Sequence, residues 1–254
     1  MSTIAVFNQK GGVGRTTTAL NLLAAIARRG RRPLGIDLDP QAHLSQIFGI
    51  EPRLADDSVC GFFTRQRPLA DVAQITRSGV MLCPAHPDLA KVGAGLGRGL
   101  DAVTRLREAL RQPDAPPGHV VIDCGPLLDA LSLNAVFACD VVVVPVSCEY
   151  LALRGAVLVE RALNALEPVF RHRPARRYLL TRYDATRAMS EGVAARMAAA
   201  LRPEEICATR IRESSGLAES PTVGLDIFRH APTSDGARDY EALDAELVRA
   251  GFAR

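Results

Sequence analysis

The sequence predicts an α/β protein in which a mostly parallel, doubly wound sheet lies between two layers of helices. Apolar runs of strand length alternate with helix-length segments along the 254 residues, and this alternation is typical of βαβ units. The runs at 119–123 and 141–146 are almost continuously apolar, as are strands that a parallel sheet buries on both faces. The first strand also ends in a glycine-rich turn that leads directly into a helix.

Each expected strand is an apolar run of strand length, and each expected helix is a longer segment between two such runs. In chain order, the strands are expected at 4–8, 33–38, 80–84, 119–123, 141–146 and 177–181. The helices are expected at 16–29, 100–111, 127–138, 151–166, 189–201 and 235–250. The glycine-rich segment 93–99 is expected to be a loop before a helix, because no strand leads into it. No Pro- or Ser-rich linker divides the chain, so a single domain over 1–254 is expected.

The composition excludes several classes of protein. With 48% apolar and 23% charged residues, the chain lacks the signature of disorder. No run approaches the roughly 18 apolar residues of a membrane helix, and the N-terminus lacks the features of a signal peptide. We therefore expect a soluble cytoplasmic protein. The six cysteines show neither a C-x-x-C pair nor zinc-site spacing, and we expect them to pack as free thiols.

Basic residues in this chain are almost all arginine. The formal net charge is +3, and of the 31 basic residues only Lys10 and Lys91 are lysines. A general bias toward arginine, as in a GC-rich genome, produces this without a functional cause. If lysine persists only where arginine cannot serve, Lys10 has a role that needs an ammonium group.

The segment NQKGGVGRTTT follows the first strand and opens the first helix. Glycines let backbone N–H groups turn toward an anion, the helix N-terminus adds partial positive charge, and the hydroxyl of Thr16 can ligate a nucleotide-bound Mg²⁺. Against the pattern G-x-x-x-x-G-K-[ST], Gln9 replaces the first glycine and Arg15 replaces the lysine. The alternative is a glycine turn that only joins strand to helix. The candidate nucleotide-binding residues are Lys10, Gly11, Gly12, Val13, Gly14, Arg15, Thr16 and Thr17.

Several segments in the same order resemble one protein family. KGGVGRTTT resembles the deviant Walker A loop of the ParA/Soj/MinD family of ATPases, GIDLDPQAHLSQIFGI its second motif and VIDCGP its Walker B strand. The resemblance continues through SLNAVFACDVVVVPVSCEYLALRG, LLTRYD, AESPTVGLDIF and GARDYEAL. It implies a three-layer P-loop NTPase fold. The chain looks closest to the short ParA/Soj type, since no helix-turn-helix segment precedes the first strand and the last helix lacks a membrane-binding apolar face.

The resemblance also implies a function. It implies a weak Mg²⁺-dependent ATPase that binds ATP, forms a homodimer on ATP, and positions or segregates a DNA or protein cargo. Such a protein cycles on nucleoid DNA, which it binds without sequence specificity, and a ParB-like or other partner stimulates hydrolysis. A cytoplasmic, nucleoid-associated protein without a membrane partner is expected.

Five residues receive roles. Asp123 ends an apolar strand, where a Walker B carboxylate holds the metal through its water shell, with Thr16 as a further ligand. Asp37 and Asp39 end the second strand two residues apart, so both are expected to point the same way. By resemblance, Asp39 orients the attacking water, Asp37 lies near the metal, and Lys10 reaches the phosphates of the partner protomer; Lys10 and Asp39 are thus the catalytic candidates.

Arg15 leaves two interpretations open. Arginine keeps the charge of the lysine, but it is larger and planar. In one interpretation it is tolerated with weaker binding or slower turnover. In the other, the protein is a hydrolysis-impaired, ParA-derived scaffold that recruits partners to a cellular assembly. An iron–sulfur relative is a third class, for which no matching cysteine pair is found.

Arginines gather in the C-terminal part of the chain, between 171 and 187. Such a cluster can contact DNA phosphates and would make binding salt-dependent; the alternative is a solvated arginine-rich surface. The family segment that resembles 213–222 often carries an arginine where Gly216 stands here, and Glu213 replaces another, which weakens the prediction of DNA binding. The candidate DNA contacts are Arg173, Arg176, Arg177, Arg187, Arg210 and Arg212.

Overall fold

The computed structural model describes residues 2–97, 99–112, 118–149, 152–170 and 175–253. Two sequence-based expectations fall outside these ranges: the DNA contact by Arg173, and position 151 as the first residue of a helix.

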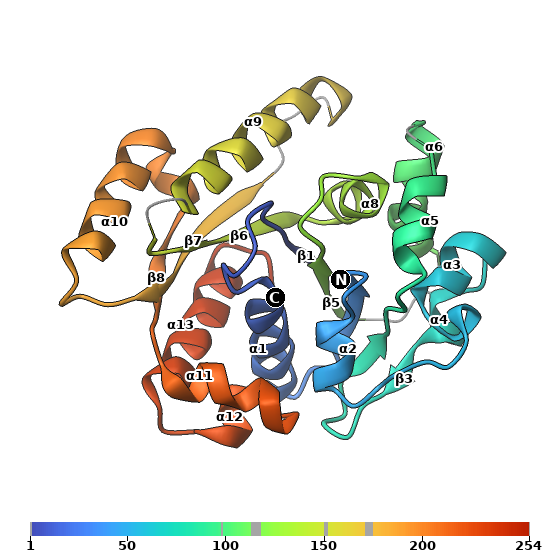
Figure 1. Ribbon diagram of the computed structural model, residues 1–254, viewed down its shortest axis with the longest axis horizontal. Coiled ribbons are helices and arrows are strands. Elements are labelled where there is room, and N and C mark those ends of the chain that lie inside the picture. Colours follow the sequence, from blue (N-terminus) through green and yellow to red (C-terminus); the bar gives the residue numbers. More distant parts are fainter. Residues whose placement is uncertain (1, 98, 113–117, 150–151, 171–174, 254) are drawn as a thin grey trace.

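An eight-stranded sheet forms the centre of the molecule, in the order β3-β4-β2-β5-β1-β6-β7-β8 (Figure 1). All neighbouring strands pair in parallel except β3 and β4, so the predicted mostly parallel sheet is confirmed. The strands are β1 (Ser2–Val6), β2 (Leu34–Leu38), β3 (Gln74–Ile75), β4 (Met81–Cys83), β5 (His119–Cys124), β6 (Val141–Ser147), β7 (Arg176–Tyr183) and β8 (Ile206–Arg212).

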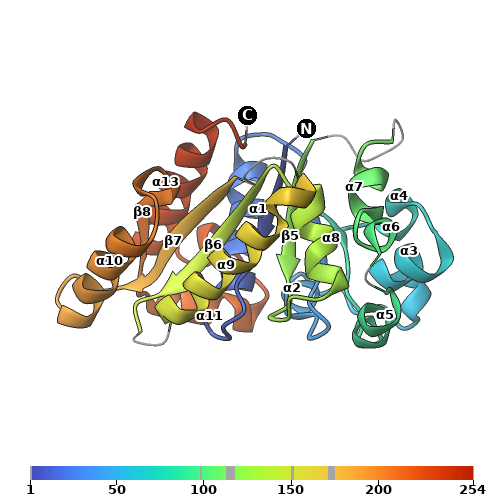
Figure 2. The ribbon, with the colours of Figure 1, turned by 90° about the horizontal axis from the view of Figure 1, so that it is seen from above.

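Helices cover both faces of the sheet. Seen from above, α8, α9 and α10 lie on one side of the sheet, and α1 and α13 lie on the other (Figure 2). The helices are α1 (Arg15–Arg28), α2 (His43–Ile47), α3 (Val59–Arg65), α4 (Leu69–Val72), α5 (Leu89–Gly95), α6 (Leu100–Val103), α7 (Arg105–Leu110), α8 (Ala130–Ala138), α9 (Ala152–Phe170), α10 (Ala188–Ala200), α11 (Ser215–Glu219), α12 (Ile227–His230) and α13 (Asp235–Arg249). Short 3-10 turns cover Ala55–Asp57, Pro203–Glu205 and Ser220–Val223. The predicted three-layer arrangement is therefore confirmed.

Side chains of β1 alternate between two apolar cores, as the two-residue period of a strand requires. Ile4 and Val6 pack with α1 and α13, whereas Ala5 and Phe7 pack with α8 and α9. All four side chains are fully buried. Because both faces of the central strands are buried, their sequences are almost continuously apolar.

The segment 93–99 corrects one expectation, because its beginning is helical. Gly93 and Gly95 close α5 instead of forming a loop. A Cβ at Gly93 would lie 2.9 Å from Cδ1 of Leu131 in α8, so this glycine permits close packing of two helices. A glycine in a sequence can indicate either a loop or the close packing of two helices, and only the position of the neighbouring helix distinguishes the two.

Other observed boundaries differ from the expected ones. The helix expected at 100–111 is divided at Thr104 into α6 and α7. α8 begins only at Ala130, because Asp129 caps it by accepting from the N–H groups of Leu131 and Ser132. Strand β8 was not predicted, since only Cys207 and Ile211 among its seven residues are buried.

Among the helices in the described ranges, none combines the length and the apolar character that crossing a membrane requires. All six cysteines are free, as expected. Cys60, Cys83, Cys124 and Cys207 are buried, whereas Cys139 and Cys148 are partly exposed.

Candidate nucleotide site

The carboxyl ends of β1, β2 and β5 bring the predicted acidic residues to the glycine-rich loop. β5 lies between β1 and β2 and pairs with both, so Asp123 is in register with Val6 on one side and with Asp37 on the other. In parallel α/β sheets, ligands bind at the carboxyl ends of the strands. The sheet order therefore assembles a site from segments as far apart in the chain as Val6 and Asp123.

The loop between β1 and α1 has the backbone geometry of an anion cradle. Gly12 and Gly14 adopt positive φ angles of 75° and 87°, which favour glycine because it has no Cβ. In the part of the chain that the structure describes, the N–H groups from Gly11 to Thr17 donate to no acceptor. These donors surround the N-terminus of α1, where its partial positive charge is concentrated.

Three contacts hold this loop in place. The amide of Asn8 donates to the carbonyl of Pro145 at 2.7 Å, and its Oδ1 accepts from the N–H of Lys10. The hydroxyl of Thr181 in β7 donates to the carbonyl of Val13 at 2.9 Å. A Cβ at Gly155 in α9 would lie 2.9 Å from Oδ1 of Asn8, so α9 packs directly on the loop.

Arg15 lies across the interior of the loop. Its Nε donates to the carbonyl of Cys124 at 3.0 Å, and its Nη1 donates to the carbonyls of Asn8 and Lys10 at 2.9 and 2.7 Å. Its Nη2 lies 3.8 Å from Oδ2 of Asp39, and the side chain is only 11% exposed. The guanidinium thus links the loop to the ends of β5 and β2.

Asp123 is a buried carboxylate without a partner. Among the described residues, neither oxygen has a hydrogen-bond partner, and the residue is 0% exposed. Burial raises the pKa of Asp123 well above its usual value and the charge of Asp37 raises it further, whereas the hydroxyl of Thr16 lies near enough to lower it. Buried polar groups are normally paired, so a buried carboxylate without a hydrogen-bond partner has the chemistry of a cation ligand.

Asp37 and Asp39 have different partners, and the expectation that their side chains point the same way stays a prediction. Both oxygens of Asp37 already accept: Oδ2 from the N–H and hydroxyl of Ser45, and Oδ1 from the N–H of Asp39. Burial raises the pKa of Asp37 to about 6, although the hydrogen bonds from Ser45 oppose the rise. The Oδ1 of Asp39 accepts from the N–H of Gln41, and its Oδ2 faces Arg15. The role of Asp37 in holding a metal stays a prediction.

Lys10 is held within its own protomer. Its Nζ donates to Glu149 at 3.0 Å, and this contact lowers the pKa of Glu149. Glu149 also pairs with Arg182 at 2.9 Å, which in turn pairs with Glu213 at 3.1 Å. Arg182 has a positive φ of 52°, a conformation that is uncommon outside glycine and is found at functional sites.

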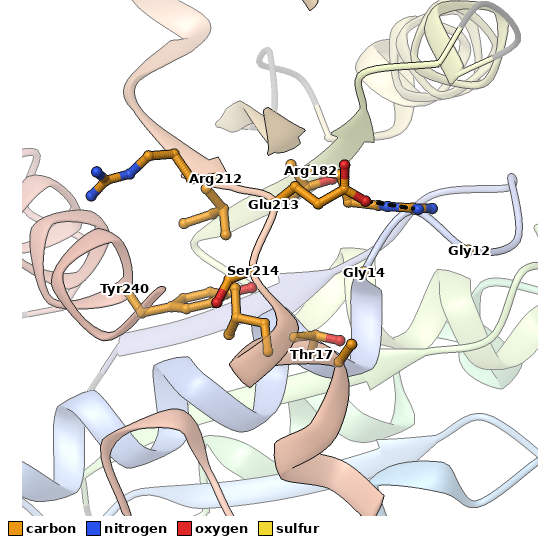
Figure 3. A pocket seen from close by; sticks show the side chains of 12 residues that line it. Gly12, Gly14, Thr17, Arg182, Arg212, Glu213, Ser214 and Tyr240 are labelled. Atoms are coloured by element: carbon orange, nitrogen blue, oxygen red, sulfur yellow. Dashed lines mark hydrogen bonds and ion pairs between the residues drawn. The ribbon is translucent and has the colours of Figure 1, made fainter. Parts of the chain in front are cut away.

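A cavity of about 220 Å³ adjoins the loop. Figure 3 shows Gly12 and Gly14 on one side of it and Arg212 and Tyr240 on the other. Glu213 and Ser214 lie between them. The sequence pattern did not single out this wall, because its parts come from β7, β8, α11 and α13, which meet only in the fold.

The predicted DNA contacts are mostly engaged within the protein. Arg176 is 0% exposed and pairs with Glu160, Glu167 and Glu205; its expected contact with DNA is wrong, since no phosphate can reach it in this structure. Arg177 donates to the carbonyl of Arg176 and lies over the ring of Phe252.

The remaining predicted arginines are exposed but paired with carboxylates. Arg187 pairs with Asp184 and Glu213. Arg210 pairs with Glu191. Arg212 pairs with Asp235 and Asp239. Their contact with DNA stays a prediction, and each contact would have to compete with an ion pair.

Comparisons with known proteins identify relatives of this chain. A family model described as "AAA domain" matches residues 1–172. The chain is 40% identical over 249 residues to the chromosome-partitioning ATPase Soj of Thermus thermophilus, covering 96% of this chain and 94% of that one. It is 34% identical to the chromosome partitioning protein ParA of Caulobacter vibrioides, covering 96% and 93%.

Solved structures show the same fold. A crystal structure described as cobyrinic acid a,c-diamide synthase from Mycobacterium smegmatis with bound ADP and magnesium matches with a TM-score of 0.83 at 31% identity, covering 99% of this chain and 95% of that one. The ATP complex of a McdA variant from Cyanothece matches with a TM-score of 0.84 over 100% and 98% of the two chains; at 19% identity, this match concerns the fold alone. This chain is therefore a member of the ParA/MinD superfamily of P-loop ATPases and belongs to its ParA/Soj type.

Proposed function

We propose that this chain binds Mg-ATP at the loop after β1, dimerises when ATP is bound, and hydrolyses ATP slowly. In this cycle the ATP dimer binds nucleoid DNA and positions or segregates a DNA or protein cargo, and a ParB-like or other partner stimulates hydrolysis. One observation carries the proposal: a loop of unbonded N–H groups lies beside a buried carboxylate that has no partner among the described residues.

The glycine-rich loop fits the phosphates of Mg-ATP, and Asp123 fits its magnesium ion. The free N–H groups from Gly11 to Thr17 would hold the phosphates. The unpaired oxygens of Asp123 and the hydroxyl of Thr16 would hold the magnesium ion, with Asp37 beside them. The ion would supply charge neutralisation at the phosphate oxygens. The solved relative with bound ADP and magnesium supports both assignments.

The cavity beside Gly12 supports binding of a complete nucleotide. It opens next to the phosphate loop and is lined by the rings and stems of Tyr240, Leu217 and Arg212. A nucleotide whose phosphates lie on the loop would place its ribose and base there, since ligand pockets combine apolar walls with a few polar groups.

Lys10 and Asp39 would act on the terminal phosphate. Lys10 is partly exposed and its ammonium is bonded to Glu149, so it can exchange this carboxylate for a phosphate of the partner protomer. The Oδ2 of Asp39 is free of hydrogen bonds within the described residues, which suits a carboxylate that orients water.

For the DNA contact we propose the end of α1 in place of the predicted C-terminal cluster. Arg28, Arg31 and Arg32 are exposed there, and they form no ion pair with a described residue. Arg249 at the end of α13 lines the same hollow as Arg28. Exposed arginines that have no internal carboxylate partner gain most from phosphate contacts.

A charge-reversal pair tests this surface. Arg31→Glu with Arg32→Glu should reduce retention of the ATP-bound protein on DNA at low salt by at least about tenfold. The matched control, Arg187→Glu with Arg210→Glu, reverses two paired arginines and should reduce retention less. A larger loss in the control would return the DNA contact to the C-terminal cluster.

The hydrolysis-impaired scaffold is a second candidate, favoured by one observation. Three hydrogen bonds of Arg15 go to backbone carbonyls, two in the loop and one at the end of β5, which differs from a lysine directed wholly at phosphate. A scaffold would bind partners without turnover, whether or not it holds nucleotide.

Calorimetry with Mg-ATP, combined with light scattering, separates the two candidates. We expect binding with a doubled mass in the wild type. Asp39→Ala should retain the ATP-bound dimer and lose turnover. Absence of ATP binding in the wild type would contradict the proposed cycle, and unchanged turnover in Asp39→Ala would remove this carboxylate from hydrolysis.

A further inference from the structure

The hydrogen bonds of Arg15 divide its guanidinium into two parts. A guanidinium has five N–H donors. Nε and Nη1 together donate to the carbonyls of Cys124, Asn8 and Lys10. Nη2 makes no hydrogen bond with the described residues, and its nearest charged partner is Oδ2 of Asp39 at 3.8 Å. One side of the guanidinium is therefore fully engaged, and the other retains its two donors.

The engaged side does not compete with phosphate. It bonds carbonyl oxygens, which repel an anion, whereas the N–H groups from Gly11 to Thr17 are left unbonded by the described residues. A side chain that blocked the loop would occupy those N–H groups or cover them with an acceptor. Arg15 instead neutralises the carbonyl side of the loop and leaves the donor side open.

Nη2, the nitrogen that retains its donors, lies beside Asp39, the carboxylate proposed to orient the attacking water. In the structure, Nη2 faces Asp39 without a direct hydrogen bond, at a distance that Coulomb attraction still spans. Burial raises the pKa of Asp123, and the charge of Arg15 opposes this rise. A terminal phosphate beside Nη2 would offer it a stronger, charge-assisted hydrogen bond than Asp39 does.

We propose that Arg15 performs with two sides of one guanidinium the work that a single ammonium performs in other phosphate loops. Nε and Nη1 clamp the loop to the end of β5, and Nη2 binds the terminal phosphate and thereby releases Asp39 to orient water. This inference rests on the proposed function and deepens it: Arg15 is both a clamp and a sensor that distinguishes ATP from ADP.

The clamp and the sensor are separable by substitution. Arg15→Lys retains a positive charge but can no longer reach three carbonyls and a phosphate at once. Arg15→Gln retains part of the polar stem and loses the charge. Both variants should therefore lower the melting temperature of the nucleotide-free protein, whereas only Arg15→Gln should lose the preference for ATP over ADP.

The experiment is calorimetry of each variant with Mg-ATP and with Mg-ADP, combined with thermal unfolding without nucleotide. Arg15→Gln should weaken ATP binding by about tenfold or more, as expected for a lost charged hydrogen bond, and weaken ADP binding much less. Arg15→Lys should recover most of the preference for ATP. Arg105→Gln is the matched control, since Arg105 also donates to a carbonyl, that of Phe63, away from the loop; it should leave the preference unchanged.

Every other outcome contradicts either the inference about Arg15 or the proposed function. If Arg15→Gln binds ATP as tightly as the wild type or more tightly, the guanidinium is not a phosphate ligand and the inference fails while the proposed function stands. If only the variants bind ATP, Arg15 blocks the loop. Unchanged melting temperatures in both variants would remove the clamp. If neither the wild type nor any variant binds ATP, the proposed function fails together with the inference.

Discussion

Two arginines in this protein, one fully buried and one largely buried, lie in opposite environments. Arg176 begins β7 beneath α9, and its Nη1 donates to Glu160 and Asn164 at 2.9 Å each. Its Nη2 donates to Glu167 at 3.3 Å, and Glu205 lies 3.9 Å from its Nε. Arg15 begins α1 at the phosphate loop, where its partners are backbone carbonyls and a single distant carboxylate.

The difference separates a charge whose partners all lie within the fold from a charge that retains unbonded donors. Around Arg176, carboxylates outnumber the cation and approach every nitrogen of the guanidinium. Around Arg15, Nη2 retains donors, and the nearby Asp123 has no partner among the described residues. Buried charges that are fully paired hold a fold in place, whereas unpaired buried donors and acceptors indicate a missing ligand.

The largest effect should come from Arg176→Ala. This change leaves Glu160, Glu167 and Glu205 without their shared cation, and the free energy of unfolding should fall by about 3 kcal/mol. Urea denaturation measures it. Arg177→Ala on the same strand is the control and should cost below about 1 kcal/mol, since it loses one cation–π contact with Phe252 and one hydrogen bond to a neighbouring carbonyl, but no ion pair. Equal losses would show that the carboxylates around Arg176 are not held by its charge.

Asp123→Asn tests the environment near Arg15, where a buried carboxylate has no hydrogen-bond partner among the described residues. Because the carboxylate is buried and unpaired within the described chain, its removal should not lower the melting temperature of the metal-free protein. The affinity for Mg²⁺ in the presence of ATP should fall on the order of 10- to 100-fold. Magnesium titration by calorimetry checks this. The control Asp140→Asn alters a carboxylate that accepts from the N–H of Thr3, so it should lower stability and leave magnesium binding intact. Lower stability with unchanged magnesium affinity in Asp123→Asn would instead show that Asp123 has a structural role.

Gly155→Ala examines the support of the loop. The new Cβ would lie 2.9 Å from Oδ1 of Asn8 and 3.1 Å from Cβ of Lys10, so the loop must shift, at a cost of about 1–2 kcal/mol. ATP affinity should fall several-fold by calorimetry. Gly192→Ala in α10 is the control: its Cβ would meet nothing within 4 Å, and the protein should gain about 0.5–1 kcal/mol of stability. An unchanged ATP affinity in Gly155→Ala would show that the loop does not depend on α9.

The smallest effect concerns His119, near the exposed arginines at the opposite edge of the sheet. Burial lowers the pKa of His119 from its usual 6.5, and the charges of Arg29 and Arg31 lower it further. The unfolded chain therefore takes up this proton first as pH falls, so the folded state loses stability, by at most about 0.8 kcal/mol from about pH 7.5 to about pH 6.

Replacing His119 by Gln keeps an acceptor for the hydroxyl of Ser2, with which its Nδ1 shares a hydrogen bond, and removes the titration. Urea denaturation at the two pH values should show a smaller loss of stability in His119→Gln than in the wild type. The exposed His43 provides the control, since His43→Gln should leave the pH dependence as it is. An identical loss in His119→Gln and the wild type would exclude the imidazole as its source.

Much of the site was predictable because it follows from strand ends. The runs ending at Asp39 and Asp123 are apolar enough to be identified as buried parallel strands, and the carboxyl ends of such strands meet at one edge. The loop at Gly11–Thr17 was predictable from its glycines and the helix after it. Ser45 was not, because its bonds with Asp37 depend on how the chain turns after β2.

Strands that are buried on both faces of the sheet were predictable from the sequence, whereas a strand with exposed side chains was not. β5 and β6 are fully buried and were predicted nearly at their observed bounds. β8 has only two buried residues, Cys207 and Ile211, among exposed and partly exposed ones, and its sequence carries no continuous apolar signal. The glycines near 93 predicted a loop, since nothing in the local sequence shows that Leu131 packs against one of them.

The sequence by itself determined the family, the strand–helix alternation and the glycine-rich turn between β1 and α1, because these depend on local pattern and on the order of motifs. The tertiary structure decided which charges are free. Arg176 and Arg31 are equivalent in a list of basic residues, yet one is enclosed by three glutamates and the other is exposed without an ion pair among the described residues. The availability of an arginine depends on the carboxylates that the fold brings beside it, and those come from segments that sequence spacing does not connect.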